Sequence, residues 1–122
     1  MVHDYVRFRM TGEVGAEVTN ISGSNFYNIS TGKYDNFLLE NFDLAECADK
    51  LAKVVQSAEH CGNVTAEVAD LLGVPAGTPV FGGFFDVVAS AVSTGVIDDT
   101  AISVAAGTWS SGSSSTRSLV PM

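Results

Sequence analysis

The sequence predicts an α/β protein, and residues 79–95 show the pattern most clearly. Residues 79–85 are apolar except for two glycines, which is typical of a short strand covered on both faces. From Val87 onward apolar residues recur at i, i+1, i+4 and i+5, which is the spacing of one helical stripe. Gly95 is placed to end that helix. A strand that leads directly into a helix is the unit from which α/β folds are built.

Asp86 lies between this strand and this helix. Unpaired backbone N–H groups and the positive end of the helix dipole favour an ionised carboxylate there, so Asp86 can be a helix N-cap. The other interpretation is a catalytic base, because ligands of open α/β sheets bind at the carboxyl ends of the strands. An acid at that place can orient a hydroxyl group for phosphoryl transfer, in which positioning supplies most of the catalysis. The residues alone leave both interpretations open.

The N-terminal third of the chain predicts short elements. Residues 4–10 read as the end of a helix that the Thr-Gly pair at 11 and 12 stops. Residues 14–28 are small and polar, which favours a loop that contains a short helix. Asp35 can then cap a further helix. The large apolar residues expected on that helix are Phe37, Leu38 and Phe42.

The middle of the chain predicts two helices and a short strand. Residues 43–55 carry apolar side chains at helical spacing, which predicts an amphipathic helix, although a break within it is left open. Its stripe consists of Leu44, Cys47, Ala48, Leu51, Ala52 and Val55. Residues 59–64 predict a short strand or turn. Thr65 can cap a helix over residues 66–72, which Gly73 ends.

The C-terminal part predicts one strand and a tail. Residues 101–106 alternate weakly and predict a strand that ends in a turn at Gly107 and Thr108. Such a turn offers backbone N–H groups and a hydroxyl to a phosphate, but an ordinary hairpin turn explains the same residues. The Ser-rich residues 111–122 predict a flexible tail.

Composition limits the partners of the chain. At 122 residues, 46% apolar and 16% charged, it is long enough for one modest globular domain. Its net charge is −8, and its six Lys and Arg residues are scattered, so nucleic acid is not an expected partner. An acidic chain does not attract a nucleotide by its own charge. A nucleotide site would need backbone N–H groups, Mg²⁺, or residues outside the chain.

The sequence favours a cytoplasmic protein without a membrane partner. No apolar run reaches the length of a membrane span, and the N-terminus has no hydrophobic core of a signal peptide. Cys47 and Cys61 are therefore expected to be free, buried thiols. His3 and His60 lie far apart and have no spacing typical of ligands, so we predict no metal site.

Several blocks of the sequence, in order, resemble the FGGY family of carbohydrate kinases, a branch of the actin-like, ribonuclease-H-like ATPases. Residues 4–12 are similar to the family's helix that ends in Leu-Thr-Gly, and residues 17–24 to its Thr-Asp-x-Ser-x-Ala-Ser segment. Residues 72–80 resemble the lead to the catalytic strand, and residues 81–95 that strand, its acid and its helix. Residues 103–109 resemble the family's second phosphate-contacting turn.

The resemblance implies a partial ribonuclease-H-like fold. Residues 1–97 would be the C-terminal part of the N-terminal lobe, residues 98–110 the first strand of the C-terminal lobe, and residues 111–122 the tail. The family's N-terminal Asp-x-Gly phosphate loop and its later glycine-rich adenosine site have no counterpart in the sequence. We therefore expect an internal fragment that is inactive by itself.

The resemblance also implies a function, the ATP-dependent transfer of a phosphate to a sugar hydroxyl, with Mg²⁺ neutralising charge. The Phe-Asp-Val-Val and Gly-Thr-Trp variants resemble most the kinases of ketopentoses, L-xylulose in particular. By the same resemblance Asp86 binds the sugar hydroxyl and takes its proton, and Gly107 and Thr108 face the phosphates of ATP. Two other classes stay open. One is an inactive remnant that forms a homodimer or binds a partner, and the other is a complete small binding domain.

Overall fold

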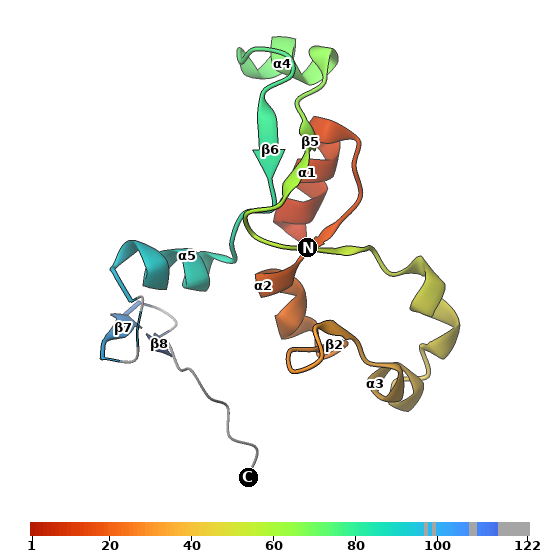
Figure 1. The fold of residues 1–122 in the computed structure, drawn as a ribbon, viewed down its shortest axis with the longest axis vertical. Helices are drawn as coiled ribbons and strands as arrows, with labels where there is room; N and C mark the ends of the chain where they lie inside the picture. Colours follow the sequence, from red (N-terminus) through yellow and green to blue (C-terminus); the bar gives the residue numbers. More distant parts are fainter. Residues whose placement is uncertain (97, 99, 108–109, 115–122) are drawn as a thin grey trace. The chain divides into compact units, whose positions relative to one another are not determined.

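The computed structural model of the chain describes residues 1–96, 98, 100–107 and 110–114. The chain divides into two compact units, Met1–Gly83 and Phe84–Met122, and each contains helices and short strands (Figure 1). The predicted lobe boundary after residue 97 stays a prediction.

The first unit opens with a helix that ends where the sequence predicts. Helix α1 spans Val2–Thr11, and Gly12 after it takes the left-handed conformation with φ of 78°. The backbone N–H of Gly12 donates to the carbonyl of Phe8 over 2.7 Å, which closes the last turn. The predicted loop with a short helix is also confirmed. Its elements are β1 (Ala16–Glu17), α2 (Val18–Ile21) and the 3-10 helix η1 (Ser22–Ser24).

A small hairpin precedes the next helix. Strand β2 (Tyr27–Asn28) pairs antiparallel with β3 (Lys33–Tyr34). Helix α3 (Asn36–Asn41) follows, and the carboxylate of Asp35 accepts a backbone N–H of its first turn over 3.0 Å. The predicted cap is therefore confirmed. The buried side chain of this helix is Leu39, 2% exposed, which was not among its predicted apolar residues.

The predicted amphipathic helix over residues 43–55 is wrong in its second half. A 3-10 helix, η2, spans Ala45–Lys50, and the backbone is extended at Leu51. Strand β4 (Val54–Val55) then pairs parallel with β1. This pairing satisfies backbone groups of β4 and buries one of its valines, and a helix continued through these residues would lose both.

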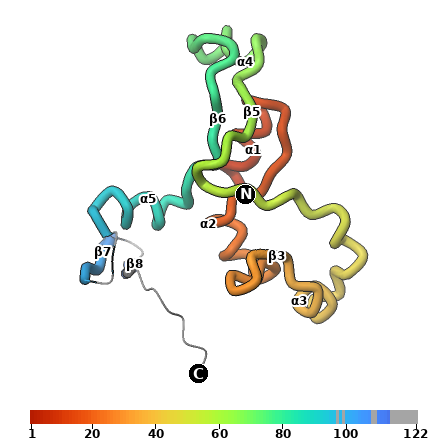
Figure 2. Tube along the Cα trace, viewed as in Figure 1, coloured from red at the N-terminus to blue at the C-terminus, as the bar shows by residue number. Residues whose placement is uncertain are grey.

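Two strands and a helix complete the first unit. Strand β5 (His60–Asn63) pairs antiparallel with β6 (Pro79–Phe81), and the strands lie side by side with α4 at their end (Figures 1 and 2). Helix α4 spans Ala66–Leu72, as predicted, and Gly73 ends it with φ of 68°. Thr65 occupies the N-cap position, but its side chain makes no capping hydrogen bond.

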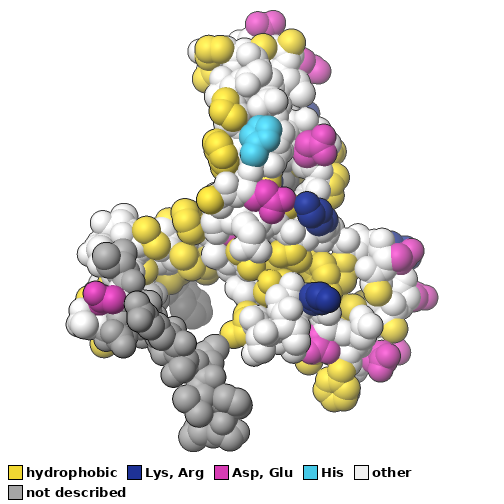
Figure 3. All heavy atoms as spheres, viewed as in Figure 1, with side chains coloured by type: hydrophobic (Ala, Val, Ile, Leu, Met, Phe, Trp, Pro, Cys, Tyr) yellow, Lys and Arg dark blue, Asp and Glu magenta, His cyan; other side chains and the backbone are white. Residues whose placement is uncertain are grey.

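The predicted burial of β6 on both faces is wrong for this chain. Phe81 is 52% exposed, because among the described residues β6 pairs with β5 alone and no second layer lies over it. Other large apolar side chains are exposed too, and Figure 3 shows hydrophobic groups on the surface between scattered charges. These surfaces would need a further layer to become a core.

The second unit consists of a helix and a hairpin. Helix α5 (Asp86–Ser93) is followed by β7 (Ile102–Ala105), which pairs antiparallel with β8 (Ser111–Ser114). A hydrogen bond of 3.0 Å joins the hydroxyls of Thr94 and Ser103 and links the end of α5 to β7. The predicted flexible tail is wrong for its first four residues, which form β8. The rest of the predicted tail lies outside the described residues.

Candidate functional site

Asp86 is the first residue of α5. Phe85 before it is the N-cap residue and has an extended backbone. The carboxylate of Asp86 accepts the N–H of Val87 over 2.8 Å, so it contacts an amide of the first helical turn. Asp86 therefore lies one residue further into the helix than the N-cap that was one of its two interpretations. Its side chain is exposed in this chain and is open to a ligand.

Helix α5 ends beside Gly95, the stop signal that the sequence predicts. Gly95 has φ of 82°, and its N–H donates to the carbonyl of Val92 over 3.0 Å. The hydroxyl of Thr94, the C-cap residue, donates to the carbonyl of Ala91 over 2.9 Å. Both contacts satisfy carbonyls that a helix end leaves unpaired, and they fix the length of the helix that carries Asp86.

The predicted phosphate turn lies in the loop of the β7–β8 hairpin. Gly107 is exposed at a bend directly after β7, and Thr108 lies outside the described residues. No hydrogen bond joins Asp86 to Gly107 in the part of the chain that the structure describes. The hairpin itself agrees with the plainer interpretation of this turn. The contact of Gly107 and Thr108 with ATP stays a prediction.

The segment just before α5 is tightly held. The N–H of Gly82 donates to the carbonyl of Glu59 over 3.0 Å, and the N–H of Gly83 to that of Ser57 over 2.9 Å. A Cβ atom on Gly82 would lie 2.2 Å from the backbone oxygen of Gln56, far inside contact distance. Only glycine fits at this position, since the neighbouring atoms belong to backbone.

A cluster of buried polar side chains lies in the same unit and was not predicted from the sequence. Asp4, Arg7, Glu17 and Asn20 are all buried, with Glu17 at 0% and Arg7 at 4% exposure. One oxygen of Asp4 accepts hydrogen bonds from Arg7 over 2.8 Å and from the backbone N–H of Glu17 over 2.9 Å. Buried charges persist only when they are paired and hydrogen-bonded. The sequence signal was an Asp and an Arg at i and i+3 of one helix.

The Glu17 carboxylate is surrounded by donors. One oxygen accepts the hydroxyl of Thr19 over 2.6 Å and the backbone N–H of Asn20 over 3.1 Å, and the other accepts the hydroxyl of Ser57 over 2.7 Å. Burial acts to raise the pKa of Glu17. The hydrogen bonds from Thr19, Ser57 and nearby backbone amides outweigh burial and hold that pKa below its ordinary value of 4.5.

This lowered pKa predicts acid sensitivity. Because the pKa of Glu17 is lower in the folded chain, its ionised form stabilises folding above pH 4.5, and this stability is lost as the pH falls through the folded pKa. We expect the free energy of unfolding in urea to fall from neutral pH to about pH 3. The Glu17→Gln variant should have a lower free energy of unfolding at neutral pH, and this free energy should change less as the pH falls. The control Glu46→Gln changes an exposed carboxylate, and its stability should depend on pH as that of the unsubstituted chain does. Equal acid profiles for Glu17→Gln and the unsubstituted chain would contradict this prediction.

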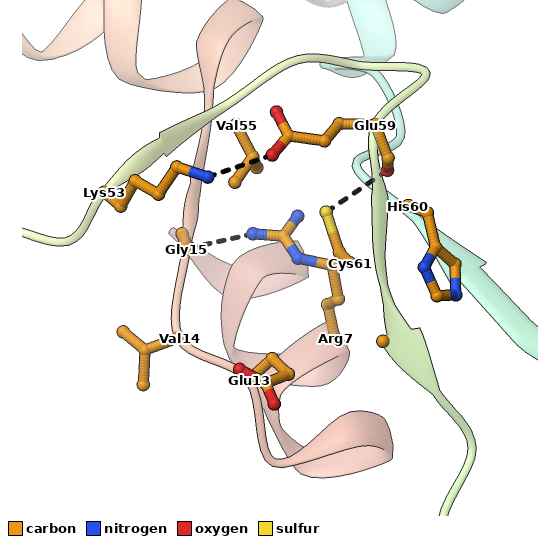
Figure 4. A pocket seen from close by; sticks show the side chains of 10 residues that line it. Arg7, Glu13, Val14, Gly15, Lys53, Val55, Glu59, His60 and Cys61 are labelled. Carbon is orange, nitrogen blue, oxygen red and sulfur yellow. Dashed lines mark hydrogen bonds and ion pairs between the residues drawn. The ribbon is translucent and has the colours of Figure 1, made fainter.

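A pocket of about 280 Å³ lies beside the buried cluster (Figure 4). The ammonium of Lys53 lies 3.1 Å from the carboxylate of Glu59, and the guanidinium of Arg7 donates to the carbonyl of Gly15 over 2.8 Å. The thiol of Cys61 donates to the carbonyl of Glu59 over 3.3 Å. These cations already have partners, so the pocket does not have the free positive charge that a phosphate group requires.

Three further observations limit the chemistry of the described residues. None of their His, Cys, Asp and Glu side chains gather in threes that could hold a metal ion. Cys47 and Cys61 are free thiols, as predicted, although only Cys61 is fully buried. No described helix has the length and hydrophobicity needed to cross a membrane.

Curated relatives match almost the whole chain. It is 48% identical over 119 residues to the L-xylulose/3-keto-L-gulonate kinase of Escherichia coli, a match that covers 98% of this chain and 24% of that protein. It is 46% identical over 110 residues to a probable L-xylulose kinase of Haemophilus influenzae, which covers 90% of this chain and 23% of that protein. The chain thus spans about a quarter of the length of these relatives.

A solved structure shares the fold. The ligand-bound xylulose kinase of Lactobacillus acidophilus superposes with a TM-score of 0.80 at 24% identity, over 89% of this chain and 22% of that one. This likeness confirms the predicted α/β class and the partial actin-like ATPase fold. Residues 1–93 match the N-terminal domain of the FGGY family of carbohydrate kinases, a range that takes in α1 to α5 and Asp86. The chain belongs to the FGGY family of carbohydrate kinases.

Proposed function

We propose that this chain is part of an ATP-dependent kinase that phosphorylates a sugar hydroxyl, and that the sugar is a ketopentose such as L-xylulose. The observation that carries the proposal is the place of Asp86, an exposed carboxylate at the start of α5, three residues after a glycine pair fixed by hydrogen bonds. The two L-xylulose kinases among its relatives support the sugar class. The cytoplasm, where ATP is abundant, is then its site of action.

Asp86 acts as the general base in this proposal. Its carboxylate accepts a hydrogen bond from the sugar hydroxyl, which orients the oxygen for attack. The proton moves to Asp86 as the sugar oxygen bonds to the γ-phosphorus, and the bond from that phosphorus to ADP breaks. The N–H of Val87, in the first turn of α5, donates to one carboxylate oxygen of Asp86 and orients the group.

The nucleotide contacts in this proposal come from the turn after β7. Gly107, exposed after β7, would donate its backbone N–H to a phosphate of ATP, and the hydroxyl of Thr108 would contact the same group. When bound, Mg²⁺ neutralises the charge of the phosphates.

A chimaera tests the proposed function. In it, this chain replaces the matching segment of the Escherichia coli L-xylulose/3-keto-L-gulonate kinase. We expect ADP release that depends on a sugar, with ketopentoses preferred over aldopentoses and L-xylulose among the best substrates. A chimaera that folds and binds ATP but releases no ADP with any sugar would overturn the proposal.

The 122-residue chain by itself is expected to be inactive. It spans about a quarter of the length of its relatives, and a base without the groups that hold both substrates has little to position. No ATP- and sugar-dependent ADP release should be detected in a coupled assay of the purified chain. Turnover by the isolated chain that Asp86→Asn abolishes would contradict this expectation.

The exposed apolar side chains favour a second candidate, a non-catalytic module that forms a homodimer or binds a partner protein. The most exposed are Val2, Phe37, Leu71, Ile102 and Val104. In the kinase proposal the rest of the enzyme covers these surfaces, whereas in the second candidate another copy or a partner does. Sedimentation of the isolated chain tests the homodimer by measuring its mass in solution. A monomer that also unfolds cooperatively on heating would argue against a homodimer, because its fold would be stable without a second copy over its apolar side chains.

A further inference from the structure

We propose that Arg7 is a positioning residue for Asp86, an inference that rests on the proposed function. Arg7 is buried in α1, and its guanidinium joins three segments of the first unit. One terminal nitrogen donates to the carbonyl of Gly82 over 2.9 Å. The other donates over 2.8 Å both to the carbonyl of Gly15 and to the carboxylate of Asp4. Figure 4 shows the guanidinium directed toward Gly15.

The glycines before α5 are thereby held from two sides. Arg7 binds the carbonyl of Gly82, while the N–H groups of Gly82 and Gly83 donate to the carbonyls of Glu59 and Ser57. The Ser57 hydroxyl also binds buried Glu17, whose backbone N–H donates to the same Asp4 oxygen that Arg7 binds. These contacts close a ring of hydrogen bonds. The ring passes through Asp4, Arg7, Gly82, Gly83, Ser57 and Glu17.

The ring ends three residues before Asp86 along the chain. Gly83 is the last residue of the first unit, and Asp86 follows it by three residues, which reach at most about 10 Å. The short backbone segment that leads to the carboxylate therefore starts at a residue that the ring holds. A displacement of about 1 Å at a reacting group can cost about a hundredfold in rate.

The choice of arginine supports a role in geometry. A buried ion pair often gives no more stability than apolar side chains of the same volume, so a gain in stability does not by itself explain why an arginine is buried here. Arginine differs in presenting several donors in a rigid plane, and here they reach Gly82, Gly15 and Asp4 together. A lysine carries the same charge but concentrates its donors on one nitrogen.

The test uses the chimaera with the double substitution Asp4→Asn and Arg7→Gln. Removing both charges avoids an unpaired carboxylate in the interior. The rate is expressed as kcat per nucleotide-binding site, counted by titration with ADP, so that misfolded molecules do not contribute. We expect kcat per site to fall at least about tenfold, with the KM for ATP and the Kd for ADP changed less than about twofold.

Arg7→Lys is the second variant, and it decides the question if the double variant binds no nucleotide. Its kcat per site should be higher than that of the double variant and lower than that of the unsubstituted chimaera. Arg9→Gln is the matched control, because Arg9 lies in the same helix but is exposed and bonds only to Tyr5 among the described residues. We expect this control to leave kcat per site unchanged.

The outcomes separate this inference from the proposed function. If the unsubstituted chimaera shows no sugar-dependent ADP release, the proposed function fails. If it is active and the Arg7 variants have the same kcat per site as Arg9→Gln, the positioning role of Arg7 is overturned and the proposed function stands. A selective fall of kcat per site in the Arg7 variants supports the inference.

Discussion

Asp86→Asn is expected to reduce kcat of the chimaera by about 10²–10⁴, the range that a general base contributes. The amide has nearly the shape of the carboxylate and can still contact a sugar hydroxyl, but it cannot accept the proton. The KM for ATP should change little, because this interaction matters in the transition state. The measurement is sugar-dependent ADP release at saturating ATP and L-xylulose.

The matched control for this prediction is Asp70→Asn, an acid exposed on α4. It makes the same change of charge and should leave kcat within about twofold of the unsubstituted chimaera. If Asp86→Asn is as active as Asp70→Asn, the general base is another residue, and the role of Asp86 is only to bind an amide of the first turn of α5.

Gly82→Ala is expected to have the second largest effect, on both stability and rate. Its Cβ would lie 2.2 Å from the oxygen of Gln56 and 3.1 Å from that of Ser57, and both are backbone atoms. Relief requires the β6 end to move away from Glu59, which breaks the hydrogen bonds of Gly82 and Gly83. We expect a loss of about 1–3 kcal/mol in the free energy of unfolding of the isolated chain. In the chimaera, kcat per site should fall by about a hundredfold.

Gly23→Ala is the control for this substitution. A Cβ on Gly23 would meet open space, and its backbone is not left-handed. The free energy of unfolding should change by less than about 1 kcal/mol in urea, in the stabilising direction if at all. Equal stability and equal kcat per site for Gly82→Ala and Gly23→Ala would contradict the close approach that the structure shows.

The sequence predicted the elements whose ends depend on local chemistry. The stop of α1 at Gly12, the cap of α3 by Asp35 and the limits of α4 were all confirmed. Gly12 and Gly73 act through a left-handed backbone, and Asp35 acts through a carboxylate that accepts a first-turn N–H, so these signals act within one helical turn. The turn into α5 was also predicted, although Asp86 is the first residue of the helix and Phe85 is its N-cap.

The errors concern contacts between distant residues. The helical spacing of residues 43–55 predicted a helix throughout, but the pairing of Val54–Val55 with β1 determines the backbone there. The apolar run at β6 predicted burial, yet burial depends on a covering layer, and Phe81 has none among the described residues. Local periodicity contains no information on which partner a segment has.

The candidate site was predicted only in part for the same reason. Asp86 was identified from its place between strand and helix and from the family resemblance. Arg7 looked like one of six scattered basic residues, and its contact with Gly82 joins positions 75 apart in the sequence. Charged residues are mostly exposed in proteins, so nothing local indicated that Arg7 and Glu17 are buried.

The most direct test of the central claim is the rate at which the chimaera converts L-xylulose to its phosphate, compared with the intact Escherichia coli kinase. If this chain is a working segment of an FGGY sugar kinase, the chimaera should form one sugar phosphate per ADP at a rate within about tenfold of that enzyme. A chimaera that folds and binds ATP, yet forms no sugar phosphate, would contradict the claim.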